Sequence, residues 1–163
     1  MQSKRQSSTA RELETLVEEM SLRGGFNHDQ CKSIARALSM CKIAHAKQMD
    51  RDDLPHSEHC IRVALKQNQP VLIIIALLHD ILEDTNITIK EIELAFSLRV
   101  ASAIEHLTKR KNEQYPDYIE RVRKNHDAIV VKIADIEDNM LRIEPERTRK
   151  IQQYLSALDI LQS

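Results

Sequence analysis

Apolar side chains recur every three or four residues along most of the chain, which is the spacing that places them on one face of a helix. No stretch alternates strongly enough for a strand, although residues 129–133, IVVKI, have a strand-like composition. We therefore expect an all-α fold, a helical bundle of about eight to ten helices. The predicted helices span residues 9–23, 28–48, 56–66, 70–85, 88–96, 100–107, 116–124, 128–135 and 145–161.

Polar residues mark several of the helix ends. Ser8 or Thr9 can cap the first helix and Asn27 the second, because such side chains accept hydrogen bonds from the first turn. Thr88 followed by Glu91 has the spacing of a capping box. The first seven residues precede the first apolar stripe, and we expect them to be disordered.

The most apolar stretch, residues 70–85, has the sequence PVLIIIALLHDILEDT. Its eight consecutive apolar residues are too few to span a bilayer and favour a buried core helix. A buried carboxylate is costly unless a partner or a metal ion compensates its charge. Two interpretations of the polar residues that follow remain open at this point: a metal site with acid and base groups beside it, or the polar end of a helix that reaches the surface. These residues are His79, Asp80, Glu83 and Asp84.

The size and charge of the chain narrow its function. Its 163 residues suffice for one well-packed domain, and a formal net charge of −1 gives no overall basic surface for a nucleic-acid partner. Cys31, Cys41 and Cys60 lack metal-type spacing and are interpreted as free core thiols in a reducing compartment. Neither a secretory segment nor a membrane span is found, so the cytoplasm is the expected location. The sequence leaves the oligomeric state open.

A second acid follows a second apolar run. Asp135 comes directly after residues 128–134, and His59 lies on a helix whose apolar face should pack inward. Imidazole and carboxylate ligands suit divalent ions such as Mn, Fe, Co or Zn, and a metal-bound water becomes acidic enough to act as a nucleophile. Glu83, one turn after His79, could then orient or deprotonate that water.

Three segments together resemble a known family. HCIRVA, ALLHDILEDT and VKIADIEDNM look like the motifs of the HD-domain metal-dependent phosphohydrolases, and within them of the RelA/SpoT-like (p)ppGpp hydrolase group, in its small single-domain type. The resemblance covers residues 43–163, and residues 1–25 form an N-terminal extension helix. It implies a single HD-type hydrolase domain over residues 1–163, without the synthetase part of the bifunctional stringent-response enzymes.

The resemblance also assigns roles to residues of this chain. The implied metal ligands are His59, His79, Asp80 and Asp135. The implied water-activating acids are Glu83 and Asp84, and the implied substrate contacts are Arg51, Lys109 and Asn139. The expected cofactor is a divalent metal, Mn²⁺ first, with Fe, Co or Zn as alternatives.

The resemblance implies hydrolysis of a nucleotide phosphate or pyrophosphate ester, like that of a (p)ppGpp 3′-pyrophosphohydrolase. Asp50 departs from the family, because it stands where an arginine associated with the guanine base is expected, and His56 replaces a tyrosine. Asp138 ends the triplet IED where the family often has R-L-H. Hydrolysis of another nucleotide phosphate, or a non-catalytic nucleotide-sensing HD module, is therefore kept as an alternative.

Three further residues keep two interpretations each. His45 and His56 can line the mouth of the site or lie on the surface. Arg62 comes one turn after His59, and it can pair with a carboxylate of the site or serve the structure alone.

Overall fold

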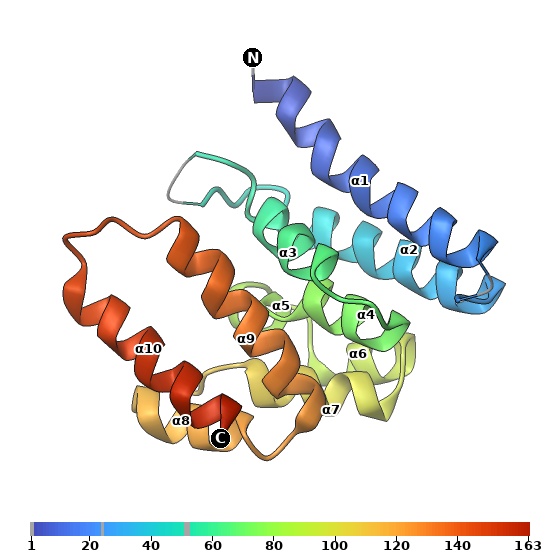
Figure 1. The fold of residues 1–163 in the computed structure, drawn as a ribbon. Coiled ribbons are helices and arrows are strands. Elements are labelled where there is room, and N and C mark those ends of the chain that lie inside the picture. Colours follow the sequence, from blue (N-terminus) through green and yellow to red (C-terminus); the bar gives the residue numbers. More distant parts are fainter. Residues whose placement is uncertain (1, 24, 51–52) are drawn as a thin grey trace.

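The computed structural model describes residues 2–23, 25–50 and 53–163, with side chains from Thr9 onward. Within these ranges the chain forms ten helices and no strand (Figure 1), which confirms the predicted all-α bundle. The helices are α1 (Gln2–Leu22), α2 (His28–Ala44), α3 (His56–Leu65), α4 (Pro70–Leu78), α5 (Ile81–Asp84), α6 (Ile89–Ala95), α7 (Leu98–Leu107), α8 (Tyr115–Val122), α9 (His126–Leu141) and α10 (Thr148–Gln162).

Helix α4 forms the centre of the core. Pro70 begins it, at a position where a helix has no need of the missing N–H group, and every residue from Leu72 to Leu78 is buried. A helix that is apolar on all sides needs neighbours on all sides, and α4 packs against α2, α3, α7 and α9. The polar residues that follow it, His79 and Asp80, are thus held at the end of a buried helix.

Helix α4 ends at Leu78, directly before the polar residues His79 and Asp80. The sequence predicted one helix over residues 70–85, but the structure has two, with His79 and Asp80 between α4 and α5. The imidazole Nδ1 of His79 lies 2.7 Å from the carbonyl oxygen of Ala76, in the last turn of α4. A periodicity of apolar residues cannot show such a break, because Ile81 is buried as well as the residues of α4.

Two of the predicted caps are confirmed. Asn27 accepts a hydrogen bond from the Gln30 N–H and forms a capping box with its side chain, and Thr88 forms the predicted box with Glu91. The cap at Ser8 or Thr9 is wrong, because α1 already begins at Gln2 and residues 2–7, expected to be disordered, are helical. Thr9 instead donates its hydroxyl hydrogen to a carboxylate oxygen of Glu58 on α3.

Three helix boundaries also differ from the sequence prediction. Helix α2 ends at Ala44 rather than at residue 48, because the chain leaves helical geometry at His45. Helix α9 continues to Leu141, so that Asp135 lies in the middle of a helix and not at its end. Helix α10 begins at Thr148 and not at residue 145.

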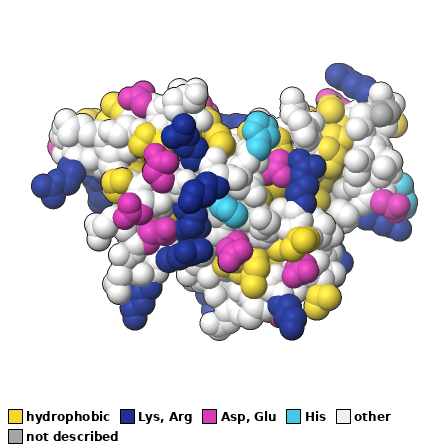
Figure 2. Space-filling model, turned by 90° about the horizontal axis from the view of Figure 1, so that it is seen from below, with side chains coloured by type: hydrophobic (Ala, Val, Ile, Leu, Met, Phe, Trp, Pro, Cys, Tyr) yellow, Lys and Arg dark blue, Asp and Glu magenta, His cyan; other side chains and the backbone are white. Residues whose placement is uncertain are grey.

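The helices pack in two groups on either side of α3 and α4 (Figure 1). Helix α1 packs on α2 and α3, where Leu13 is fully buried, and α10 packs on α8 and α9. On the face drawn in Figure 2, basic and acidic side chains are interspersed. None of the described helices combines the length and the apolarity that a membrane span requires.

Candidate functional site

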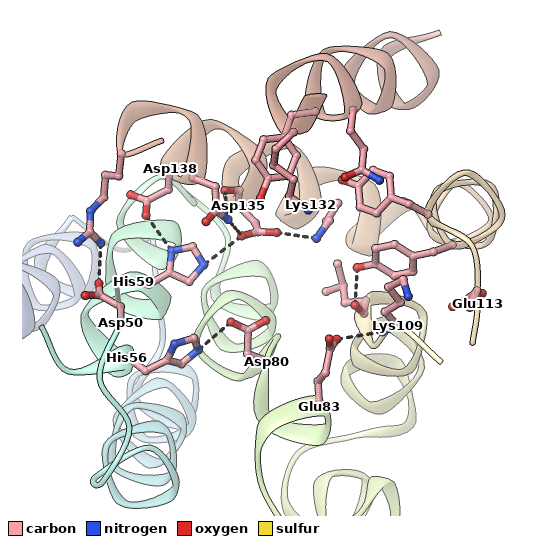
Figure 3. A pocket seen from close by; sticks show the side chains of 18 of the residues that line it. Asp50, His56, His59, Asp80, Glu83, Lys109, Glu113, Lys132, Asp135 and Asp138 are labelled. Carbon is pink, nitrogen blue, oxygen red and sulfur yellow. Dashed lines mark hydrogen bonds and ion pairs between the residues drawn. The ribbon is translucent and has the colours of Figure 1, made fainter. Parts of the chain in front are cut away.

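The four predicted metal ligands converge from three parts of the fold. His79 lies between α4 and α5. Figure 3 shows the other three, His59 from α3, Asp80 from the junction of α4 and α5, and Asp135 from α9. One potential ligand atom from each of His59, His79 and Asp80 lies within 4.8 Å of the other two. Oδ1 of Asp135 lies 3.0 Å from Nε2 of His59 and 3.8 Å from Nε2 of His79. Two imidazoles and two carboxylates therefore face one point.

The two ring nitrogens of His79 have different surroundings. Because its Nδ1 donates to the Ala76 carbonyl, Nε2 is the nitrogen with the lone pair. This Nε2 is buried and has no hydrogen-bond partner among the residues that the structure describes, and Oδ1 of Asp80 lies 3.3 Å away. Burial would lower the pKa of His79, but the charges of Asp80 and Asp135 outweigh it and raise the pKa. The donor set thus fits a divalent cation, which would compete with a proton for Nε2.

The ring of His59 is held by carboxylates at both nitrogens. Nε2 lies 3.0 Å from Asp135, and Nδ1 lies 2.8 Å from Oδ2 of Asp138. Burial opposes the charged form, but the hydrogen bonds to these two carboxylates raise the pKa of His59 to about 10. Asp138 in turn receives two hydrogen bonds from the guanidinium of Arg62, at 2.9 and 3.0 Å. Arg62 therefore pairs with a carboxylate of the site, which decides between its two interpretations.

Two more side chains of α9 bind the carboxylate of Asp135. Lys132 places Nζ 2.7 Å from Oδ2, and Asn139 places Nδ2 2.6 Å from Oδ1. Burial disfavours a charged lysine, but the charge of Asp135 more than compensates and the pKa of Lys132 is raised. The sequence carries a signal for Lys132 that was missed: it is a lone cation in an apolar run, one helical turn before Asp135.

The two predicted water-activating acids lie at different places. Glu83 of α5 lines the cavity, and its Oε2 accepts a hydrogen bond from the backbone N–H of Lys109 at 3.1 Å. Burial raises the pKa of the Glu83 carboxyl. The carboxylate of Asp84 is turned toward His56 instead, with Oδ2 3.5 Å from Nε2. That same His56 nitrogen lies 2.9 Å from Asp80, which places His56 at the mouth of the site.

A cavity of about 750 Å³ opens beside the ligand cluster (Figure 3). Cationic and aromatic side chains also line it, namely Lys109, Lys132, Arg142, Lys150, Tyr115, Tyr118 and Tyr154. The hydroxyl of Tyr118 donates to the Leu107 carbonyl at 2.5 Å. The lining thus combines carboxylates that suit a metal ion with cationic and aromatic groups that suit an anionic ligand with a ring system.

Hydrogen bonds from Arg121 hold both ends of the loop that carries Lys109. Arg121 of α8 donates to both carboxylate oxygens of Glu113, at 2.8 and 2.9 Å, and to the carbonyls at the end of α7. These contacts hold the pKa of Glu113 at about 2. The loop therefore presents the Lys109 N–H to Glu83 from a fixed position.

Comparison with known proteins gives relatives of one kind. The chain is 34% identical over 135 residues to a guanosine-3′,5′-bis(diphosphate) 3′-pyrophosphohydrolase of Aquifex aeolicus, a match that covers 74% of this chain and 19% of that protein. It is 28% identical over 142 residues to the bifunctional (p)ppGpp synthase/hydrolase SpoT of Escherichia coli, covering 76% of this chain and 20% of SpoT. The chain is a distant homologue of the SpoT-like (p)ppGpp hydrolase domains.

A solved structure has a fold similar to that of this chain. A solved structure of a metazoan orthologue of SpoT, described as hydrolysing ppGpp with a role in starvation responses, superposes with a TM-score of 0.70. The match has 23% sequence identity and covers 79% of this chain and 85% of the other. This confirms the predicted HD-domain fold. No protein-family model matches the chain, and the chain spans about a fifth of the length of the curated relatives it matches.

The structure also shows where the residues lie at which this chain departs from the motifs of the SpoT-like hydrolases. Asp50 lines the cavity and forms an ion pair with Arg142, with 2.8 Å between Oδ2 and Nη1. Its Oδ1 accepts a hydrogen bond from the Leu54 N–H at 3.0 Å, which fixes the acid in the loop before α3. Arg51, a predicted substrate contact, lies outside the described residues. Asp138 supports His59, a role that sequence reasoning missed.

Proposed function

We propose that the chain is a metal-dependent phosphohydrolase that acts on a phosphate or pyrophosphate ester of a nucleotide, in the manner of a (p)ppGpp 3′-pyrophosphohydrolase. The observation that carries this proposal is the convergence of His59, His79, Asp80 and Asp135 beside a cavity that Lys109 and Lys150 also line. Such a pairing of charges suits a metal ion together with a phosphate chain.

The four converging residues would hold the cofactor. Their imidazole and carboxylate donors fit Mn²⁺, and Fe, Co or Zn ions accept the same donor types. When bound, a divalent ion lowers the pKa of a coordinated water and polarises a phosphoryl oxygen. Asp138 fixes the orientation of His59, and Ala76 fixes that of His79, so both imidazoles present Nε2 to the same point.

Glu83 is the residue best placed to remove a proton from the attacking water. Its carboxylate lines the cavity, and the hydrogen bond from Lys109 holds it in one orientation. Burial raises its pKa toward the range in which a carboxylate can accept a proton near neutral pH. Asp84 was predicted to share this role; its contact with His56 suits an effect on the position of that histidine and of Asp80.

The cavity suits a nucleotide. Lys109 lines the cavity and supplies charge for a phosphate, and the ammonium of Lys150, which lies over the rings of Tyr115 and Tyr154, brings a further positive charge to the cavity. Asn139 reaches the cavity from the same side as Asp135 and remains a proposed substrate contact, as do Lys109 and Arg51.

Hydrolysis by the purified chain with added Mn²⁺ tests the proposal. The panel comprises ppGpp, GDP, a nucleoside 3′-phosphate and NADPH, with Asp80→Asn as the inactive comparison. Release of pyrophosphate from ppGpp by the wild type alone would support the full proposal. Release of phosphate from another nucleotide alone would keep the chemistry and change the substrate. No turnover of any of them, with ppGpp binding intact, would contradict catalysis and favour the nucleotide-sensing alternative.

A further inference from the structure

A second group of metal-type side chains lies behind the proposed active centre. Cys41 and His45 are one turn apart at the end of α2, and Cys60 lies on α3. One potential ligand atom from each lies within 4.8 Å of the other two, and all three residues are fully buried. The sequence does not show this group, because nineteen residues separate the two cysteines and only the packing of α2 against α3 brings them together.

The hydrogen bonds around His45 determine which of its nitrogens bears the lone pair. The side-chain nitrogen of Gln48 donates to the backbone carbonyl of Asp84 at 2.6 Å, so its amide oxygen must face His45. That oxygen lies 2.7 Å from Nδ1 of His45, and Nδ1 therefore carries the hydrogen. The lone pair is on Nε2, which is buried and lacks a hydrogen-bond partner within the part of the chain that the structure describes.

An unsatisfied buried acceptor is costly, so a partner for Nε2 is expected. Two buried thiols can pack in a core without any ion, but neither of these thiols donates to Nε2. The arrangement at His45 is the one that metal-binding histidines use, with one nitrogen donating to an amide oxygen and the other free to coordinate. Two thiolates and a divalent ion sum to zero charge, which removes most of the cost of burying the ion.

We propose that Cys41, His45 and Cys60 bind a soft divalent metal ion, Zn²⁺ by ligand type, at a second site beside the His/Asp centre. His56 is the fourth ligand that the structure offers. Its ring centroid lies 4.8 Å from that of His45, and it forms, with Cys60 and Asp80, another group of potential ligand atoms within 4.8 Å. Cys₂His₂ is a common ligand set of structural zinc.

The ion would join the end of α2 to α3. Its ligands Cys60 and His56 flank the His59 position along α3, so a bound ion would hold the helix that presents His59. The role is structural, and the site would exist whether or not the cavity hydrolyses nucleotides.

Cobalt substitution tests the site directly. Reduced, metal-free full-length protein is titrated with Co²⁺ and followed by absorption, because only thiolate ligands give an intense near-ultraviolet charge-transfer band. We expect two equivalents bound by the wild type, with the band, and loss of the band and of one equivalent in Cys41→Ser. Cys31→Ser, also on α2 but outside the group, should keep both.

Asp135→Asn separates the two sites, since it should weaken the His/Asp centre and keep the band. Saturation of the wild type at one equivalent without the band would overturn the proposal, as would a band that survives in both Cys41→Ser and Cys60→Ser. Far-ultraviolet circular dichroism shows that each variant is folded, and the wild-type spectrum decides the question even where a variant is not.

Discussion

Oδ2 of Asp138 lies 2.8 Å from Nδ1 of His59, although 79 residues separate them in the sequence. The other nitrogen of the same ring points to Asp135 and the proposed metal position. A carboxylate behind a metal-binding imidazole fixes the ring and makes its nitrogen more basic. Through this contact, Asp138 would orient His59 as a ligand of the proposed metal ion.

Asp138→Asn is expected to weaken Mn²⁺ binding by about 10- to 100-fold, because loss of such a supporting partner has that effect in other metal sites. Competition with a chelator of known affinity measures it. Glu137→Gln is the matched control: it removes one negative charge from the adjacent position, where the side chain is half exposed and pairs with Lys66. Equal weakening in both variants would mean that charge alone, and not the contact with His59, matters.

Glu83→Gln is expected to lower kcat by about 10²- to 10⁴-fold, the usual contribution of a general base, while the bound metal is unchanged. Steady-state kinetics on the substrate found in the panel, together with metal analysis, measure both effects. Asp84→Asn is the matched control, and we expect the smaller loss from it because its carboxylate is turned toward His56.

The pH profile gives an independent check on Glu83. A general base must be deprotonated, so kcat should rise with pH through the pKa of its carboxyl. Because burial raises that pKa, the acidic limb should lie above the ordinary glutamate range. An acidic limb that stays in place in Glu83→Gln would assign it to another group.

Asp50→Asn should lower KM for an anionic nucleotide, by up to about tenfold, equivalent to about 1.4 kcal/mol, with little change in kcat. The variant removes an anion from the cavity and from the guanidinium of Arg142. Asp53→Asn makes the same charge change in the same loop at an exposed position. If both variants lower KM equally, the effect is long-range and does not depend on Arg142.

Glu113→Gln should destabilise the protein by about 1 kcal/mol at neutral pH, since it breaks the paired hydrogen bonds with Arg121. The pKa of Glu113 is about 2 in the folded protein against an ordinary value of 4.5, so its stabilising effect is full above about pH 4.5. That effect should disappear as the pH falls through about 2. Denaturant unfolding at several pH values measures the difference.

Glu120→Gln is the control for that series. Glu120 is exposed on the same helix and forms an ion pair at 3.7 Å with Arg123, which should contribute little. A stability difference between the wild type and Glu113→Gln that is constant from pH 7 to pH 3 would contradict the assignment to the carboxylate charge.

The sequence predicted the helical fold because apolar periodicity is a local pattern, and it indicated the convergence of Asp80 with Asp135 through the motifs around the two acids. Apolar periodicity marks the helices, and the motif around each acid marks the family. The structure then adds what only packing decides. These include the end of α4 at Leu78, where His79 contacts the Ala76 carbonyl, and the contact of Thr9 with Glu58 on a neighbouring helix.

Side chains far apart in the sequence were the main source of missed contacts. Asp138 reads as a departure from the family motif, and its contact with His59 cannot be derived from spacing. Cys41 and Cys60 are free and buried, as predicted, and the packing of α2 on α3 brings them together. Lys132 is the exception, because its position in an apolar run next to Asp135 could have identified it.

The buried helix α4 has a consequence for how this protein can change over evolutionary time. Its end carries His79 and leads into Asp80, so the residues of the proposed chemistry are inherited with the core, and a substitution there costs stability and activity together. The loop with Asp50 and the loop with Lys109 line the cavity from outside that core. Substitutions in these loops can therefore change which substrate binds while the residues of the proposed reaction stay the same.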